Sequence, residues 1–274
     1  MKTLFRVLAL VPLPVLHALG AVLGWLSFVA SATYRRRFMD NARQAGFALG
    51  QVRAAVAESG KLVAEAPRLW FGRAVRIDWE NEACIEAALA RGKGIVFLTP
   101  HLGCFEVSAQ AYALRYGRIT VLYRPARKAW LRDLVDTARG RSNLVTAPTT
   151  MMGVRQMLKA LKAGEAVGLL PDQVPPQGMG EWAGFFGRDA YTMTLPARLA
   201  QQTGAAIVLA WAERLPWGRG YRVHLREWTE EISREGAVAA GQVNARMETL
   251  IRECPGQYLW GYARYKAPRV EAVA

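Results

Sequence analysis

Residues 94–106, GIVFLTPHLGCFE, decide the fold of this chain. An apolar strand at 95–98 runs into a Thr-Pro break, and His101 follows directly. A helix-compatible run then begins at Phe105. Open α/β sheets are built from strands that lead into helices, and their chemistry lies just past the carboxyl ends of the strands. The segment therefore predicts an α/β fold with His101 at its functional edge.

A carboxylate, Glu106, lies five residues beyond this histidine. Helical residues five apart lie roughly 140° apart around the axis, so the two side chains can meet only if His101 is in the turn and Glu106 in the first helical turns. A carboxylate on one ring nitrogen fixes the tautomer and leaves the other nitrogen free to take a proton. We therefore interpret His101 and Glu106 as a catalytic general-base pair, with an oxyanion site at the helix amino terminus. The alternative is a histidine packed in a turn and a solvated glutamate.

Composition limits the possible classes of protein. A chain of 274 residues that is 52% hydrophobic suits one large domain with an appendage. Its net charge of +14 favours polyanionic partners, which are nucleic acid, anionic lipid or an acidic protein. Cys84, Cys104 and Cys254 have no paired spacing, which disfavours a disulfide framework or a zinc site. Cys104 lies beside the histidine, but a small apolar helix residue is the favoured interpretation over a nucleophile.

The amino-terminal segment is expected to be a membrane anchor. No formal charge occurs from Val7 to Tyr34, and three arginines follow at 35–37. A helix over 15–33 would reach roughly 28 Å, enough for a bilayer core. The run at 30–32 resembles a signal-peptide cleavage site, but the arginines oppose translocation and favour a cytoplasmic body. We expect a retained anchor at residues 1–34, spanning the membrane or lying in its interface, and a second domain at 35–274. A buried core helix is the remaining alternative.

The body alternates between strands and helices. Strands are predicted at 95–99, 119–123, 166–170, 206–211 and 221–225, near Leu144, and at 75–79. Helices are predicted at 105–116, 129–139, 151–163, 194–203 and 240–253. This alternation predicts a mostly parallel or mixed central sheet flanked by helices.

Polar clusters follow the predicted strands, where a site would be built. A basic cluster after the second strand includes Arg124, Arg127, Lys128 and Arg132. Arg139 and Arg141 follow the next helix, and Asp172 follows the strand at 166–170, which places its carboxylate at the edge of the sheet beside His101. A Gly/aromatic loop at 178–188 ends at Arg188 and is long enough for a lid. These cations around one histidine predict a site for an anionic substrate.

Several of these segments occur together in one known family. In chain order they are YRRRFMDNARQAGF, TPHLGCFE, YRP with RGRSN, LKAGEAVGLLPDQ, FFGRDAYTMTLPARLAQQTGA and QYLWGYARYKAP. Over nearly its whole length the chain resembles the lipid A late acyltransferases, the lauroyl/myristoyl transferases of Gram-negative inner membranes. The resemblance implies that an acyl chain passes from acyl-acyl carrier protein to a 3-hydroxyacyl hydroxyl of a Kdo-bearing lipid A precursor. It implies no metal or other cofactor, with acyl-coenzyme A as the other candidate donor, and a site at the cytoplasmic face of the inner membrane.

The resemblance also implies roles for particular residues. His101 and Glu106 would be catalytic, and Arg139 and Asp172 would matter for activity. Some members have a second acidic residue two positions after the Asp172 equivalent, where this chain has Val174. Substrate phosphates or Kdo carboxylates would be held by arginines, the candidates being Arg139, Arg141 and Arg188. The basic cluster at 124–132 would meet carrier protein or lipid headgroups.

Three other functions compete with this interpretation. A related O-acyltransferase could act on a glycerophosphate or glycolipid, although glycerolipid enzymes usually have Asp where this chain has Glu106. A thioesterase would usually need a nucleophile, and no Gly-x-Ser-x-Gly occurs. A basic, membrane-tethered nucleic-acid-binding protein would explain the charge of +14. We expect no nucleic-acid partner, because the charge is spread over α/β loops.

Overall fold

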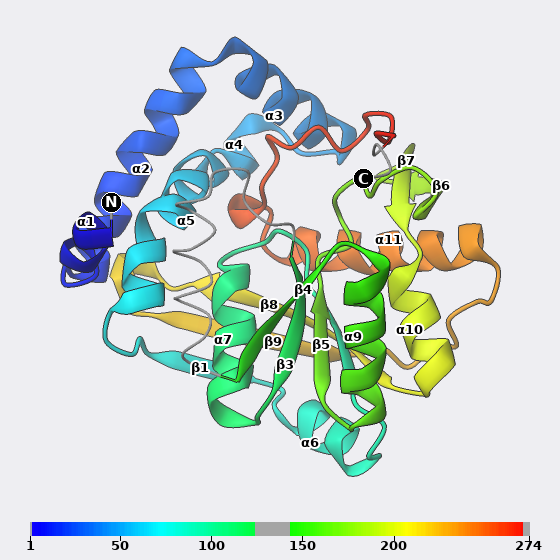
Figure 1. Ribbon diagram of the computed structural model, residues 1–274. Helices are drawn as coiled ribbons and strands as arrows, with labels where there is room; N and C mark the ends of the chain where they lie inside the picture. The colour runs from blue at the N-terminus through cyan, green and yellow to red at the C-terminus, as the bar shows by residue number, and fades with distance from the viewer. Residues whose placement is uncertain (1, 124–142, 271–274) are drawn as a thin grey trace.

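One seven-stranded sheet organises the computed structural model, which describes residues 2–123 and 143–270 (Figure 1). The strand order is β1-β9-β8-β2-β5-β3-β4, and a separate hairpin is formed by β6 and β7. The strands are β1 Ile77–Glu80, β2 Ile95–Leu98, β3 Ile119–Tyr123, β4 Leu144–Pro148, β5 Ala166–Leu169, β6 Gly180–Phe185, β7 Arg188–Met193, β8 Ala206–Arg214 and β9 Tyr221–Glu227. The strands predicted at 95–99, 119–123, 166–170, 206–211 and 221–225 are confirmed, as are those near 75–79 and 144.

The sheet is mixed. β8, β2, β5, β3 and β4 run parallel to one another, whereas β9 is antiparallel to β8 and β1 is parallel to β9. The central strands β2 and β5 are buried throughout, which is why their sequences are continuously apolar rather than alternating. The predicted fold class, an α/β fold with a mixed sheet and an apolar amino-terminal helix, is confirmed.

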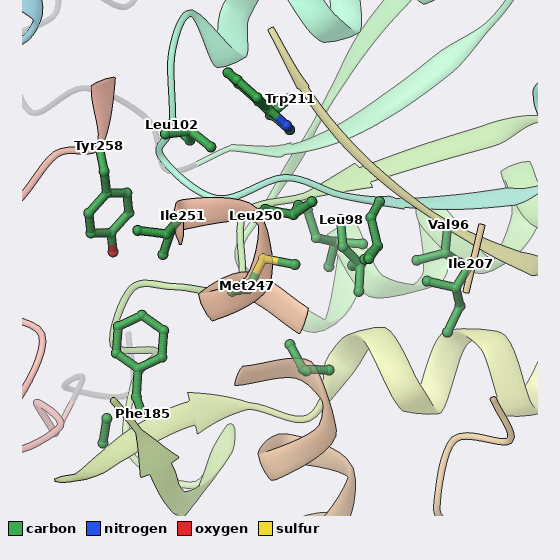
Figure 2. Close-up of a cluster of buried hydrophobic side chains, with 14 of the residues drawn as sticks. Val96, Leu98, Leu102, Phe185, Ile207, Trp211, Met247, Leu250, Ile251 and Tyr258 are labelled. Carbon is green, nitrogen blue, oxygen red and sulfur yellow. The ribbon is translucent and has the colours of Figure 1, made fainter. Parts of the chain in front are cut away.

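Helices cover both faces of the sheet. The described helices are α1 Lys2–Leu8, α2 Leu13–Ala30, α3 Ala32–Gln44, α4 Leu49–Val52, α5 Ala54–Phe71, α6 Ala83–Ala90, α7 Phe105–Arg115, α9 Met151–Lys162, α10 Leu195–Thr203 and α11 Gly236–Glu253. One core joins α9, α10 and α11 to side chains such as Val96, Leu98 and Ile207 (Figure 2). A second core joins α6 and α7 to the opposite face. The helix predicted at 129–139 lies outside the described residues.

The apolar helix α2 lies at one side of the molecule, against α5 (Figure 1). Glycines permit this close approach: a Cβ on Gly60 would come 2.0 Å from the carbonyl oxygen of Gly20, and one on Gly24 would come 2.2 Å from that of Val56. Within the part of the chain that is described, α2 is the one helix long and apolar enough to cross a membrane. The predicted domain boundary after Tyr34 falls inside α3, and a separate anchor at 1–34 stays a prediction.

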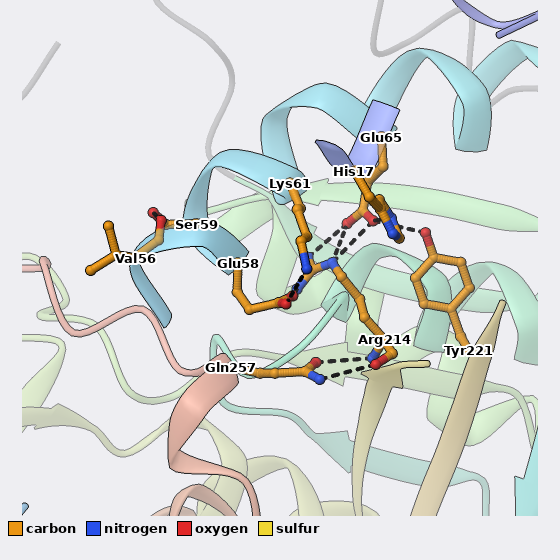
Figure 3. Close-up of polar contacts among 9 residues, drawn as sticks. All are labelled: His17, Val56, Glu58, Ser59, Lys61, Glu65, Arg214, Tyr221 and Gln257. Carbon is orange, nitrogen blue, oxygen red and sulfur yellow. Dashed lines mark hydrogen bonds and ion pairs between the residues drawn. The ribbon is translucent and has the colours of Figure 1, made fainter. Parts of the chain in front are cut away.

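A buried ionic junction joins α2 and α5 to the sheet (Figure 3). Glu65 of α5 accepts hydrogen bonds from Arg214 Nη2 at 2.6 Å and from the Tyr221 hydroxyl at 2.8 Å, and His17 Nε2 of α2 lies 2.9 Å from it. Arg214 Nη1 also reaches Glu58 at 3.3 Å. Burial raises the pKa of Glu65, but the charge of Arg214 and the hydrogen bonds outweigh it and hold the pKa at about 2.

The predicted Gly/aromatic lid loop at 178–188 is wrong for most of its length, because residues 180–193 form the β6–β7 hairpin. The turn uses Phe186 at φ 47° and Gly187 at φ 73°, the left-handed backbone of tight two-residue hairpins. Two side chains of α11 fix it: Asn244 Nδ2 donates to the Gly184 carbonyl at 2.9 Å, and Glu248 accepts from the Phe186 N–H at 2.6 Å. The segment is therefore a packed wall rather than a free loop.

Candidate active site

The site begins with the register of two parallel strands. Leu98 of β2 pairs with Leu169 of β5, and three residues beyond these partners lie His101 and Asp172. Because both strands end at the same edge, the two side chains meet there: His101 Nδ1 is 2.7 Å from Asp172 Oδ1, and the His101 N–H donates to Oδ2 at 2.9 Å. The prediction that Asp172 lies beside His101 is confirmed.

The Asp172 carboxylate is buried and ionised. Burial raises its pKa, but the charge of His101, two hydrogen bonds from that residue and the charge of Arg264 together lower it below its ordinary value. The Tyr258 hydroxyl also bonds this carboxylate, and its own pKa is raised well above the usual range by burial. An ionised acceptor on Nδ1 assigns the ring proton to that nitrogen, so the lone pair of a neutral ring is on Nε2.

The outer nitrogen faces an open pocket. The His101 side chain is 16% exposed, and its Nε2 lies 3.0 Å from the Gln173 side-chain nitrogen. The pocket measures about 440 Å³ and is mostly apolar. It is lined by strand ends, by α7 and by Met179 and Met193 of the hairpin segment.

The carboxylate on the ring differs from the one that the sequence indicated. The spacing predicts that Glu106 is bonded to the His101 ring, whereas Nδ1 is bonded to Asp172. Glu106 lies in the first turn of α7, as expected, and lines the same pocket. Its catalytic role stays a prediction.

The sequence analysis did not single out several pocket residues, and four of them bear directly on the site. Phe105 packs edge-on against His101 with ring centroids 4.9 Å apart. Lys266 lines the pocket with its ammonium 4.8 Å from the Tyr262 ring, and the Tyr262 hydroxyl accepts from the Val174 N–H at 3.1 Å. The fourth is Gln173. Its position next to Asp172 in the sequence could have identified it as a site residue. Tyr262 and Lys266 follow no strand, and they reach the site only because the carboxyl-terminal segment folds back to the pocket.

Of the remaining predicted site residues, the structure describes Arg188 alone. Arg188 begins β7, is exposed, and places its guanidinium 4.7 Å over the Tyr265 ring rather than among the pocket-lining side chains. Its role in substrate binding stays a prediction. Six further predicted cations lie outside the described residues: Arg124, Arg127, Lys128, Arg132, Arg139 and Arg141.

Cys104 has the properties of an interior residue. Its side chain is fully buried, and its pKa is raised well above the usual range by burial and by the charge of Glu65, to which the thiol is hydrogen-bonded. The thiol is therefore protonated at neutral pH, unlike the thiolate of a nucleophilic cysteine. No group of three or more potential metal-ligating side chains was found in residues 2–123 and 143–270.

In this site a buried carboxylate orients a histidine, and the other ring nitrogen faces an apolar pocket. This arrangement is typical of enzymes in which a histidine activates a hydroxyl or a water molecule for attack on an apolar substrate. Comparison with known proteins narrows this class. Residues 2–267 match the family model of the bacterial lipid A biosynthesis acyltransferases. The chain belongs to this family and is an enzyme that transfers acyl groups.

Individual relatives are distant. The chain is 27% identical over 212 residues to the lipid A biosynthesis palmitoleoyltransferase of Escherichia coli K12, which covers 76% of this chain and 68% of the relative. It is 28% identical over 180 residues to the lauroyltransferase of the same organism, covering 65% and 58%. A lipid A biosynthesis acyltransferase of Haemophilus influenzae is 24% identical over 184 residues, covering 64% and 55%.

Proposed function

We propose that this enzyme transfers a fatty acyl chain from acyl-acyl carrier protein to the hydroxyl of a 3-hydroxyacyl chain on a Kdo-bearing lipid A precursor. Membership of the family supports lipid A as the acceptor. The observation that carries the chemistry is the His101–Asp172 pair at the mouth of an apolar pocket of about 440 Å³. Such a pocket suits a hydrocarbon chain whose reactive carbonyl stops at the histidine.

In the proposed reaction, His101 acts as the general base. The acceptor hydroxyl first displaces the Gln173 amide from Nε2. This nitrogen then takes the hydroxyl proton while the hydroxyl oxygen attacks the thioester carbonyl. The new C–O bond forms, the C–S bond breaks, and the imidazolium returns the proton to the departing thiolate. Asp172 holds the ring in the required tautomer throughout. General-base assistance of this kind contributes roughly 10²–10⁴-fold.

Charge that develops on the carbonyl oxygen needs donors close to the histidine. The first turn of α7 begins at Phe105, which lines the pocket. The amino-terminal N–H groups of a helix lie at the positive end of its dipole, where negative charge is stabilised. We assign the oxyanion to these groups, each worth roughly 10²–10³-fold in rate. Glu106 in the same turn is the second carboxylate of the site and stabilises the imidazolium.

The acceptor carries phosphates and carboxylates, so cations should surround the pocket. Lys266 is the described cation that lines it. We assign Lys266, together with Arg139 and Arg141, to these anionic groups, and Arg188 to a peripheral contact. The acidic carrier protein or anionic headgroups would meet the basic cluster formed by Arg124, Arg127, Lys128 and Arg132.

We place the enzyme on the cytoplasmic face of the inner membrane, held by the outward face of α2. The inward face is occupied by α5, whereas large apolar side chains remain exposed on the other side, such as Leu19, Leu26 and Val29 at 53%, 60% and 70%. The arginines at 35–37 favour a cytoplasmic body. Flotation with anionic vesicles should carry the wild type upward. A Leu26→Asp, Val29→Asp double variant should stay at the bottom, and equal flotation of the two proteins would contradict this attachment.

The experiment that tests the function is mass spectrometry of the reaction product. Purified enzyme in detergent is incubated with a tetra- or penta-acylated lipid A precursor and with acyl-carrier-protein donors, and in parallel with acyl-coenzyme A. We expect one acyl mass increment with wild type and none with folded His101→Ala. No increment with any donor from folded wild type would contradict lipid A as the acceptor and direct the search to glycerophosphate or glycolipid acceptors.

A further inference from the structure

The pocket continues into a second cavity under α7. This inner cavity shares four wall residues with the main pocket, namely Phe105, Ala109, Val121 and Leu170, so the two spaces adjoin. It runs between α7 and the face of the sheet and ends among residues absent from the main pocket, including Trp79, Ile85 and Leu225. Phe105 stands at the junction, with its ring against that of His101.

Small side chains on both walls create this space. On the sheet, Gly168 of β5 pairs with Phe97 of β2 and with Val121 of β3, so these three positions point to the same face. On α7, residues 105, 108, 109 and 112 follow helical spacing toward that face, and the middle two are Ser108 and Ala109. Protein interiors are otherwise close-packed, so small residues facing one another beside an active site call for an occupant.

The inner cavity is mostly apolar. Its volume is about 40 Å³. Because one water-sized group needs roughly 10–15 Å³ of cavity volume, the inner cavity holds about three such groups. That is room for the last carbons of a chain whose remaining length lies in the main pocket.

We propose that the inner cavity receives the methyl end of the donor acyl chain and that Gly168 sets how many carbons fit. This inference rests on the proposed function. A Cβ on Gly168 would lie 3.2 Å from Val121 Cγ1 and 3.7 Å from Ile119 Cδ1, directly in the cavity wall. Any side chain there shortens the space, whereas trimming Ile119, which lines the inner cavity alone, lengthens it.

The test is a donor competition. Wild type, Gly168→Val and Ile119→Ala are each incubated with an equimolar mixture of acyl-carrier-protein donors that differ in chain length. The products are then identified by mass spectrometry. Gly168→Val should shift the preferred chain to a shorter one and Ile119→Ala to a longer one. Because a methylene that no longer fits a closed pocket changes discrimination by roughly 10–200-fold, the shift should be at least tenfold in the product ratio.

The control is Gly184→Val. Gly184 lies in β6, and an added Cβ would meet nothing within 4 Å, so this variant should keep the wild-type distribution. If Gly168→Val is unfolded by circular dichroism, Gly168→Ala takes its place. An unchanged chain-length distribution in both folded cavity variants, with wild-type transfer intact, would overturn the inference and leave the proposed function standing.

A binding measurement separates the two claims if no transfer is seen. Thermal stabilisation by S-acyl-N-acetylcysteamine thioesters of increasing chain length should depend on chain length in wild type, with a shorter optimum in the Gly168 variant. This pattern without transfer supports the cavity and contradicts the proposed function. Stabilisation independent of chain length contradicts the cavity.

Discussion

Two buried carboxylates in this molecule are bonded to histidines, with opposite consequences. Glu65 lies against His17, and Arg214 and a tyrosine fill its remaining sites, so the junction is closed to solvent. Asp172 is equally buried, but its histidine, His101, turns Nε2 toward an open pocket. The same pair of residue types thus holds helices together in one place and can exchange a proton with a substrate in the other. The two pairs differ in whether a substrate can reach the second ring nitrogen of the histidine.

The third histidine, His224, has an acidic side chain near each ring nitrogen and does not line the active-site pocket. His224 Nε2 lies 3.0 Å from Glu213, and its ring is stacked on Trp211 with centroids 4.2 Å apart. All three histidines of the chain therefore have an acidic neighbour. A histidine–carboxylate pair alone does not identify an active site.

The largest effect should come from Asp172→Asn. The amide no longer fixes the Nδ1–H tautomer, so the rate of acyl transfer should fall by roughly 10²–10⁴-fold with the fold retained. Single-turnover rates with saturating donor measure this. Asp78→Asn, which alters only a surface ion pair with Arg76, should keep the wild-type rate. If Glu106→Gln abolishes transfer while Asp172→Asn retains it, Glu106 rather than Asp172 orients the base.

A substitution in the closed Glu65 junction should lower the stability of the protein rather than the rate of acyl transfer. Glu65→Ala leaves the Arg214 charge buried without its main partner, which costs about 3–5 kcal/mol in unfolding free energy. Thermal melting in detergent checks this, and Glu86→Ala on the exposed side of α6 should melt like wild type. Transfer per folded molecule should stay unchanged. A selective loss of rate in a stable Glu65→Ala protein would show that the junction contributes to the chemistry rather than to stability.

Acid should weaken the same junction. The pKa of Glu65 is about 2 in the folded protein against 4.5 when unperturbed, so its contribution is complete above about pH 5 and is lost as pH falls toward 2. The lost stability is about 3 kcal/mol over that range. Melting temperatures from pH 5 to 3 should fall more steeply for wild type than for Glu65→Gln. Parallel curves would show that Glu65 is not held ionised by its partners.

A smaller effect is expected at the rim of the open site. Lys266→Met removes a cation from the pocket wall, so KM for the lipid acceptor should rise about tenfold with kcat little changed, the size of one charged hydrogen bond. Lys159→Met, on the exposed side of α9, should leave KM as it is. A fall in kcat with unchanged KM would assign Lys266 to the chemical step instead of to acceptor binding.

The sequence predicted the sheet well because its central strands are short apolar runs bounded by turns. It also placed His101 and Asp172 at one edge, since both follow parallel strands. The sequence did not show which carboxylate is bonded to the His101 ring. That contact depends on β2 and β5 being neighbours in register, and neither segment alone determines the order of the strands. Glu106 is close to His101 in the chain, whereas Asp172 is 71 residues away.

Other features depend on tertiary contacts that no local pattern carries. The β6–β7 hairpin resembles a Gly/aromatic loop in sequence, and its strands are fixed by Asn244 and Glu248 from α11. His17 looked like part of an apolar anchor, but a buried glutamate 48 residues away accounts for it. Lys266 enters the pocket only through the return of the carboxyl-terminal segment.

The most direct test of the account compares the three histidines in one assay. Single-turnover acyl transfer is measured for His101→Ala, His17→Ala and His224→Ala, each normalised to the folded fraction. We predict that His101→Ala loses transfer, whereas the other two variants melt at lower temperature and keep the wild-type rate per folded molecule. Transfer at the wild-type rate by His101→Ala would contradict the assignment of His101 as the base.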